Sequence, residues 1–424
     1  MKELKKFIIL WSTQALSSLG SSMTSFALTL WLYEKTGSAL QTALLSICSY
    51  APYVTMSIFA GALSDRWNKK KVLLVCDTLA ICSTLVVFAL LKTGQLLPLH
   101  LYMLNAVNGL MNTVQQPANE VAMTLIIPKE HYQKTSGMRS FSRSLVTILN
   151  PVISTAVFSF WGIETVIRID ICTFVIAFIS LLFFIKIPTT KIEQKQKKES
   201  MKESVKGGVG FLLEHKIVLV LILFLSGVNL IASAFDAVLP AYVLSAKNGG
   251  KVVLGVVTST AGIATLVGSV IVTFLKKPKD RVRTIYITML ISLSVEHFLF
   301  AFCRTPFWWC IGQIVGWTLV PVMSANLDVI LRSTIPVEMQ GRVYSCRNSL
   351  QFFTIPVGFF LGGFLVDNVC EPIMASVGTK GFLVNLFGSG KGSGAAMMMF
   401  ILGVSGTAIC LVFGQILKKY KYED

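Results

Sequence analysis

Residues 61 to 71 read Gly-Ala-Leu-Ser-Asp-Arg-Trp-Asn-Lys-Lys-Lys and lie between two long apolar segments. Gly61 allows two membrane helices to approach closely, and Asp65 can pair with a basic partner or face the N-terminus of a neighbouring helix. Arg66 and the lysines that follow would hold the connection on the cytoplasmic side of a membrane. Asn68, at the turn, tolerates a left-handed backbone. The stretch therefore predicts a short basic turn between two membrane helices.

Apolar segments recur on both sides of this turn along the whole chain of 424 residues. Hydrophobic residues make up 54% of the chain and charged residues 14%, with a mean hydropathy of +0.68, whereas soluble proteins carry about 25% charged residues. A helix needs about twenty apolar residues to cross the hydrocarbon layer. The sequence predicts twelve such helices, over residues 7–32, 41–63, 72–92, 99–126, 135–159, 163–186, 216–243, 252–275, 284–303, 307–331, 343–366 and 395–417.

The excess of basic residues has a membrane interpretation. The 38 Lys and Arg against 21 Asp and Glu give a net charge of +17, which by itself could indicate a nucleic-acid partner. The basic residues, however, concentrate in every second connection between apolar segments, as they do in cytoplasmic loops. This pattern predicts a multi-pass membrane protein with both termini in the cytoplasm and no nucleic-acid partner.

The predicted helices divide six and six around a charged stretch. We expect an N-terminal six-helix bundle over 1–187, a cytoplasmic linker over 188–215 and a C-terminal six-helix bundle over 216–424. The segment 127–130, Ile-Pro-Lys-Glu, recurs about half a chain later as Ile-Pro-Val-Glu at 335–338, which indicates an internal duplication. The expected fold is an all-α integral membrane protein of two pseudo-symmetric bundles, the architecture of many transporters.

The turn also carries a family resemblance. The chain resembles the major facilitator superfamily, whose signature in this loop is Gly-x-Leu-x-Asp-Arg-x-Gly-Arg-Lys. Asn68 stands here in place of the second glycine. The resemblance implies a transporter that works as a monomer. The positions that match the signature are Gly61, Leu63, Asp65, Arg66, Lys69 and Lys70.

Within that superfamily the chain is most similar to the drug-exporter branch that includes bacterial macrolide-efflux proteins. The similarity rests on residues 33–39, Tyr-Glu-Lys-Thr-Gly-Ser-Ala, on Pro128-x-Glu130, and on Pro356-x-Gly358 with Gly362-Gly363. It implies an antiporter of the bacterial cytoplasmic membrane. Two departures weaken that implication, since residues 105–109 lack the arginine found in the fourth helix of many proton-coupled exporters, and the antiporter signature of the fifth helix is reduced to Asn150-Pro151.

Two acidic residues inside apolar segments are candidates for proton coupling, because an ionisable group at bilayer depth is costly and needs a partner or a function. Asp236 precedes Pro240 in the seventh segment, and such breaks line cavities; the alternative is an interfacial carboxylate near the outer mouth. Asp77 in the third segment couples protons or pairs with loop Arg and Lys residues. Adjacent Glu296 and His297 point about 100° apart on a helix and favour a helix–helix contact.

Polar and aromatic side chains within the apolar segments suggest a substrate cavity. An amide facing lipid is unfavourable, so the amides are expected to face water or protein, where interhelical hydrogen bonds explain them equally well. Aromatic residues suit amphipathic substrates but also pack or face lipid. The candidate cavity residues are Gln14, Asn112, Gln115, Asn229 and Phe235.

These features favour a secondary active transporter, not an enzyme. The sequence contains no Walker loop, no metal-ligand cluster and no Gly-x-Ser-x-Gly motif, so we expect no cofactor and no bound metal. The leading prediction is export of amphipathic, macrolide-type molecules by alternating access, driven by protons. The alternatives are an importer or facilitator of another small solute and a lipid or lysophospholipid flippase of the same fold.

Overall fold

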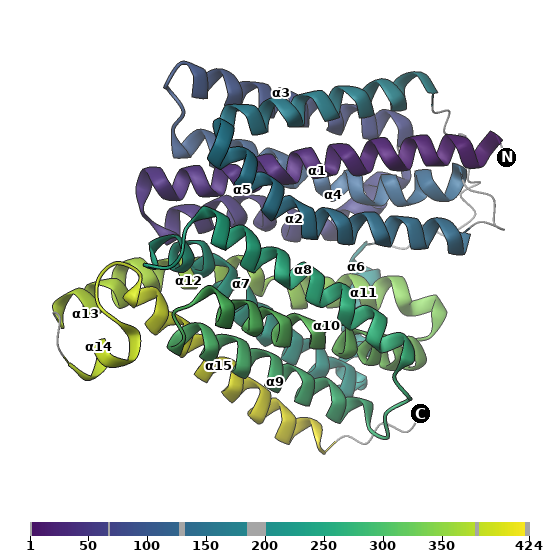
Figure 1. The fold of residues 1–424 in the computed structure, drawn as a ribbon. Coiled ribbons are helices and arrows are strands. Elements are labelled where there is room, and N and C mark those ends of the chain that lie inside the picture. The colour runs from purple at the N-terminus through teal and green to yellow at the C-terminus, as the bar shows by residue number, and fades with distance from the viewer. Residues whose placement is uncertain (1, 67, 127–131, 185–200, 378–380, 420–424) are drawn as a thin grey trace. The chain divides into compact units, whose positions relative to one another are not determined.

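The computed structural model describes residues 2–66, 68–126, 132–184, 201–377 and 381–419, and every regular element in these ranges is a helix (Figure 1). The helices follow the predicted apolar segments closely, because in lipid a helix satisfies its own backbone hydrogen bonds. The all-α membrane fold predicted from the sequence is therefore confirmed, and the helices are consistent with twelve spans.

Helices of the N-terminal half run beyond the predicted segments at most ends. Gly162, with φ 78° and ψ 171°, interrupts the long helix α5, and it lies where the fifth and sixth predicted segments meet. Its backbone conformation is one that glycine adopts without strain. The elements are α1 (Lys2–Thr36), α2 (Ala39–Arg66), α3 (Lys69–Lys92), α4 (Pro98–Ile126), α5 (Tyr132–Ile179) and the π-helical turn η2 (Ser180–Phe184).

The C-terminal half contains more helices than predicted. Most of the additional ones are short and lie outside the predicted apolar segments. Residues 201–214, within the stretch expected to be a linker, form a helix that packs on α11, and two short helices occupy the long connection before the last span. The elements are α6 (Met201–Glu214), α7 (Lys216–Ser245), α8 (Lys251–Phe274), α9 (Arg281–Phe302), α10 (Pro306–Thr334), α11 (Val337–Phe352), α12 (Thr354–Leu365), η3 (Val366–Cys370), α13 (Glu371–Ser376), α14 (Phe382–Phe387) and α15 (Ser393–Leu417).

The chain forms two compact units. The first contains Met1–Glu34 and Cys48–Lys198, and the second contains Lys35–Ile47 and Glu199–Asp424. The first turns of α2 thus belong to the second unit. Within the second unit, α9 packs on α10 and α15, while α7 packs on α12 and α15.

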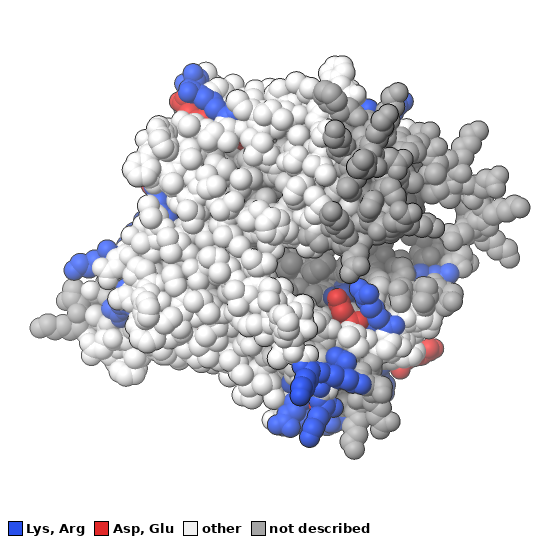
Figure 2. Space-filling view, turned by 45° about the vertical axis from the view of Figure 1, so that its right-hand side comes forward, with Lys and Arg blue, Asp and Glu red and all other residues white. Residues whose placement is uncertain are grey.

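The surface has the composition expected of a protein in lipid. Within the described ranges, eight helical stretches are long and apolar enough to cross a membrane. Large apolar side chains are exposed on them, including Phe160, Phe183 and Phe274, whose exposed fractions are 77%, 72% and 82%. Figure 2 shows a wide area without charged side chains, with Lys and Arg gathered toward its edges. Because large apolar side chains are exposed on this surface, it would be unfavourable in water.

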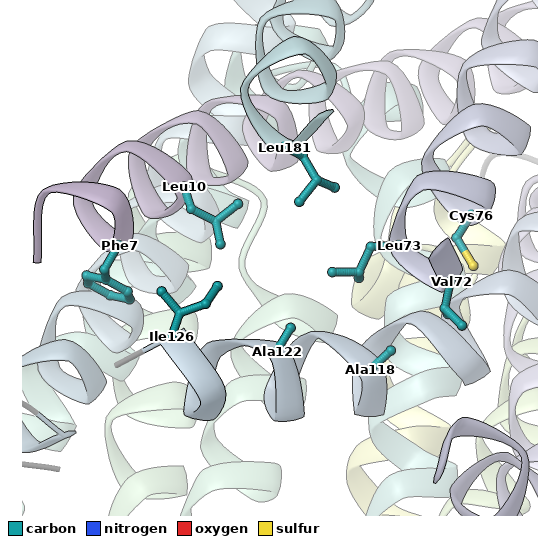
Figure 3. Packing of buried hydrophobic residues seen from close by; sticks show 9 residues of the cluster. All are labelled: Phe7, Leu10, Val72, Leu73, Cys76, Ala118, Ala122, Ile126 and Leu181. Atoms are coloured by element: carbon teal, nitrogen blue, oxygen red, sulfur yellow. The ribbon is translucent and has the colours of Figure 1, made fainter. Parts of the chain in front are cut away.

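A compact apolar core holds the first unit together (Figure 3). Small residues of α4, Ala118 and Ala122, lie against larger side chains of α1 and α3, so the helix axes can approach closely. Leu181 of η2 is fully buried in the same cluster. Its members are Phe7, Leu10, Val72, Leu73, Cys76, Ala118, Ala122, Ile126 and Leu181.

The basic turn differs from the sequence prediction at Asn68. This residue has φ −63° and ψ 118°, an extended conformation, and its side chain accepts a hydrogen bond of 3.2 Å from the Lys71 N–H. It therefore acts as the N-cap of α3, a role in which asparagine is strongly preferred. The left-handed turn expected at this position is not formed.

Candidate functional site

Asp236 is the most unusual acidic residue of the second unit. It lies in α7 and is exposed, whereas Phe235 before it and Ala237 after it are both 3% exposed. An exposed carboxylate within an apolar helix is a candidate for lining a cavity, because such a group does not face lipid without a large cost.

Pro240 increases the polarity at Asp236. Proline has no N–H, so in the continuous helix α7 the backbone carbonyl of Asp236, four residues earlier, receives no helical hydrogen bond. The residue thus presents two acceptors, its side chain and its backbone oxygen. The sequence predicted a break in the helix at this point, but α7 runs through Pro240 without interruption, and only one backbone hydrogen bond is lost.

Glu296, in α9, lies in the same region of the unit as Asp236, because the rings of their chain neighbours His297 and Phe235 are only 4.9 Å apart, and the two acidic groups affect each other electrostatically. Its side chain is 5% exposed and faces α10, where the indole N–H of Trp317 is directed at it. Gly316 leaves the space for this carboxyl, since a Cβ there would lie 2.7 Å from the Glu296 Cδ. Glu296 Oε1 makes no hydrogen bond.

His297 points in a different direction from Glu296, as adjacent residues on a helix must. Its ring is 1% exposed and lies 4.9 Å from the Phe235 ring, and its Cβ lies beside Gly403 of α15. The Leu293 carbonyl faces the ring, but neither ring nitrogen meets it at hydrogen-bond geometry. His297 makes the helix–helix contact expected from the sequence, whereas the Glu296 carboxyl lies in a recess between α9 and α10, beside Gly316.

Two predicted cavity residues of the second unit take part in packing. Phe235 is buried between His297 and Phe300, whose ring meets it edge-on at 5.1 Å. The side-chain amide of Asn229 donates to the Gln351 carbonyl at 3.0 Å and so joins α7 to α11. Asn229 therefore makes the interhelical hydrogen bond that the sequence left open as an alternative.

In the first unit, Asp77 and Gln115 are brought together. The Gln115 amide donates to Asp77 Oδ1 at 2.7 Å, between α4 and α3. Asp77 is 9% exposed and is bonded to an amide of the neighbouring helix, where the sequence suggested loop Arg or Lys residues. Asn112, one turn earlier on α4, is exposed, and Gln14 of α1 is half-buried.

Part of the signature turn can be described. Lys70 donates from Nζ to the Leu182 carbonyl at 2.9 Å and so ties the start of α3 to the π-helical turn after α5, where cations are favoured because helix ends carry free carbonyls. Gly61, Leu63, Asp65 and Arg66 lie in the last turns of α2, and the roles predicted for their side chains stay predictions. In the second unit, Asp280, which is followed by Arg281 as Asp65 is followed by Arg66, caps α9 by accepting from the Arg283 N–H at 2.8 Å.

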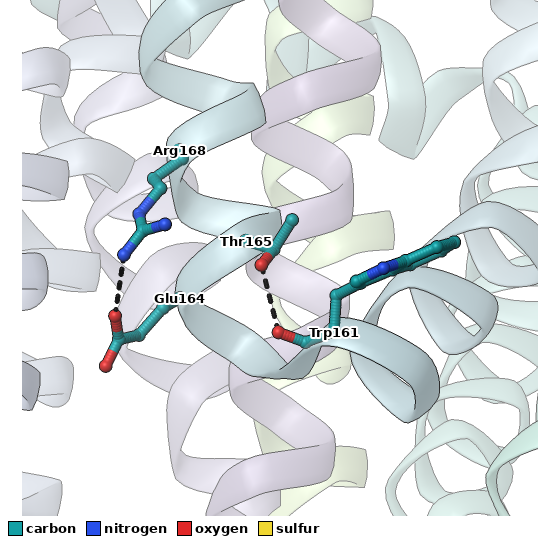
Figure 4. Close-up of polar contacts among 4 residues, drawn as sticks. All are labelled: Trp161, Glu164, Thr165 and Arg168. Atoms are coloured by element: carbon teal, nitrogen blue, oxygen red, sulfur yellow. Dashed lines mark hydrogen bonds and ion pairs between the residues drawn. The ribbon is translucent and has the colours of Figure 1, made fainter.

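Polar residues of α5 are accounted for by local contacts. Arg168 donates to Glu164 at 3.0 Å in an exposed ion pair one turn apart (Figure 4), and such a pair adds little stability. Asp170 is 3% exposed and accepts from Ser21 at 2.9 Å. Within the described ranges, no group of three His, Cys, Asp or Glu side chains is placed to hold a metal ion.

The helical fold and the membrane-exposed surface define a multi-pass membrane protein, and a family comparison identifies its class. The model of the Major Facilitator Superfamily matches residues 10–358. The chain therefore belongs to the major facilitator superfamily, a family of transporters and not of enzymes.

Related proteins agree with this assignment. Macrolide efflux protein A of Streptococcus pyogenes is 24% identical over 375 residues, which cover 86% of this chain and 90% of that protein. Among solved structures, a nucleoside transporter superimposes with a TM-score of 0.71 at 13% identity, covering 98% of this chain and 100% of that one. A bacterial homologue of the iron transporter ferroportin gives a TM-score of 0.71 at 14% identity, covering 98% and 99%. At these identities the structural matches establish the fold alone.

Proposed function

We propose that this transporter exports amphipathic, macrolide-type molecules across the bacterial cytoplasmic membrane and is driven by protons moving inward. The observation that carries the proposal is Asp236, an exposed carboxylate in an otherwise apolar helix, next to the buried acid Glu296. A carboxyl that solvent reaches can take up and release a proton during the transport cycle. The similarity to macrolide efflux proteins supports the substrate class.

Asp77 is proposed as a second coupling residue. It is nearly buried and hydrogen-bonded to Gln115, so a change of its protonation would alter a contact between α3 and α4. Loss of that bond on protonation would connect proton binding to helix packing in the first unit. Gln14, Asn112 and Gln115 are proposed to contact substrate in this unit. In the second unit, Asn229 and Phe235 are proposed to support the substrate site by holding its helices in place.

Replacing Asp236 by asparagine is expected to abolish gradient-driven efflux while leaving the protein folded, because the asparagine side chain has the same shape but cannot take up or release a proton. Efflux of fluorescent amphiphiles and a macrolide should be measured in cells with wild type, Asp236→Asn or Asp77→Asn, with and without a protonophore. We expect a reduction of at least about tenfold for Asp236→Asn. Glu164→Gln, an exposed acid outside the site, is the matched control.

Other results of this efflux assay, together with a lipid-transport assay in vesicles, would support other functions. Protonophore-insensitive flux of the compounds would contradict proton coupling. Uptake in place of efflux would indicate an importer or facilitator, and absence of flux for every compound, with lipid movement in vesicles, would indicate a flippase.

The topology is proposed to place both termini, and the turn at Lys69–Lys71, in the cytoplasm. Single cysteines at Ser64 and at Lys247, in a background without native cysteines, are expected to react oppositely with a membrane-impermeant maleimide in intact cells. Lys247 should be labelled and Ser64 protected, because basic connections are retained inside. The reverse pattern would contradict the proposed orientation.

A further inference from the structure

Glu296 occupies an environment that does not suit an ionised carboxylate. A carboxylate has acceptor sites on both oxygens, yet Oε1 is buried without a hydrogen bond, and the Trp317 indole is the donor directed at the group. A buried charge without sufficient donors is strongly unfavourable. The neutral acid, with fewer acceptor sites to satisfy, fits this recess better.

Among the residues that the structure describes, the parts of α7, α9, α10, α14 and α15 that lie near Glu296 contain no Lys or Arg to balance a negative charge. On α7, the titratable group facing it is Asp236, which adds a like charge. Helix α15, which packs on α9, contains no charged residue, and α14 contains none. On α10 the charged residues, Asp328 and Arg332, lie three or more turns beyond Trp317. His297 points away, towards Phe235.

The recess is part of the packing between α9 and α10. Gly312 and Gly316, four residues apart on α10, allow that helix to lie close to α9, as small residues do in membrane helix pairs. Ser292, one turn before Glu296, donates to the Gly316 carbonyl at 2.9 Å. The carboxyl therefore has a defined position beneath the helix surface, while its neighbour Asp236 is exposed.

We infer that Glu296 and Asp236 form a single proton-carrying pair, in which Glu296 stores the proton in the recess beside Gly316 and Asp236 exchanges it with water. The proton passes from the Glu296 carboxyl to the Asp236 carboxylate and from there to solvent, and returns by the reverse route; no other bond changes. The inference deepens the proposed function and rests on it for its role in transport.

Infrared spectroscopy tests the stored proton without any transport assay. Purified wild type at pH 7 is expected to show the C=O stretch of a protonated carboxyl that is missing from Glu296→Gln and retained in the control Glu164→Gln. Asp236→Asn should keep this band but shift its frequency, because the neighbouring group has changed. A wild type minus Glu296→Gln difference that contains only ionised-carboxylate bands would overturn the inference, and an unshifted band in Asp236→Asn would overturn the pairing.

Transport by liposomes containing the purified protein tests what the proton does. Erythromycin exchange at equal pH and erythromycin accumulation driven by a pH gradient should be compared for wild type and Glu296→Gln. We expect exchange within about twofold of wild type and gradient-driven accumulation reduced at least about tenfold. Retention of both activities would overturn the inference. If both are lost, the infrared band decides.

The two proposals fail in different ways. If wild type moves no compound in response to a pH gradient but shows the Glu296 band, proton-driven drug export is wrong and the proton-holding pair stands. If wild type is driven by the gradient and Glu296→Gln is driven equally, the transport function stands and Glu296 does not carry the proton.

Discussion

Replacing Gly358 by alanine is expected to prevent stable packing of α12 on α7 and to remove most of the folded protein. A Cβ at this position would overlap the Ser233 hydroxyl oxygen and the Leu230 carbonyl oxygen. Backbone atoms of a helix cannot move aside as a flexible side chain can. We expect a loss of about 3 kcal/mol or more in the free energy of unfolding, measured by SDS-induced unfolding in mixed micelles.

Gly210 provides the matched control for this substitution. It lies in helix α6, and a Cβ there would meet no atom within 4 Å. Alanine is the better helix former, so Gly210→Ala should leave the protein as stable as wild type or up to about 1 kcal/mol more stable. Equal stability of the two variants would show that the close approach at Gly358 does not limit packing.

Pro356-x-Gly358 and Gly362-Gly363, which carry part of the resemblance to drug exporters, place their glycines at close helix contacts. Gly362 faces α7, where a Cβ would lie 2.5 Å from the Ala234 carbonyl oxygen, and Gly363 faces the start of α2, where a Cβ would lie 2.6 Å from the Leu40 Cα. Two adjacent glycines thus serve two different helix contacts. The sequence could indicate close approach but not which partner each glycine meets.

The spans could be predicted because hydropathy and helix length depend on local sequence alone. The fifth and sixth predicted segments lie where they were expected, and the non-helical backbone at Gly162 separates them within α5. The helix at 201–214 was missed because its polar residues outweigh a short apolar face. Phe211 and Leu212 of that face are buried, with exposed fractions of 6% and 1%, but burial against α11 is a tertiary effect.

The candidate site was only partly accessible from the sequence. Asp236 stood out because it is an acid before a proline in an apolar segment. Glu296 did not, because its significance depends on Gly316, which is twenty residues away on another helix. The pair Gly312 and Gly316 was the available signal, since this spacing predicts a close helix contact. The Asp77 partner could not be predicted because it depends on the rotation of α3 against α4.

A single carboxylate, Asp367, joins the start of α2 to the rest of the second unit. It accepts hydrogen bonds from the Ser38 hydroxyl at 2.6 Å, the Ala39 N–H at 3.0 Å and the Leu40 N–H at 2.9 Å. Ser38 in turn accepts from the Gln41 N–H at 3.1 Å, as an N-cap residue does. A negative charge at a helix N-terminus is further stabilised by the helix dipole. Residues 33–39, which carry part of the resemblance to drug exporters, thus include Ser38, the N-cap residue of α2.

Replacing Asp367 by alanine is therefore expected to destabilise the protein by about 2 to 4 kcal/mol, because hydrogen bonds to a charged group are strong and two backbone N–H groups lose their acceptor. The same SDS unfolding assay measures the loss. Asn368→Ala, which removes one hydrogen bond of 3.2 Å to the Phe364 carbonyl within the same helical segment, should cost much less.

A double-mutant cycle with Ser38→Ala identifies the source of the effect. If Asp367 acts through the cap, Ser38→Ala should cost clearly less in the Asp367→Ala background than in wild type, because residues that share a hydrogen-bond network are not additive. Additive costs would mean that the two residues stabilise the protein independently. In that case the first turn of α2 would be held mainly by the packing of Leu40 against Gly363 and of Ala43 against Ala237 and Phe359.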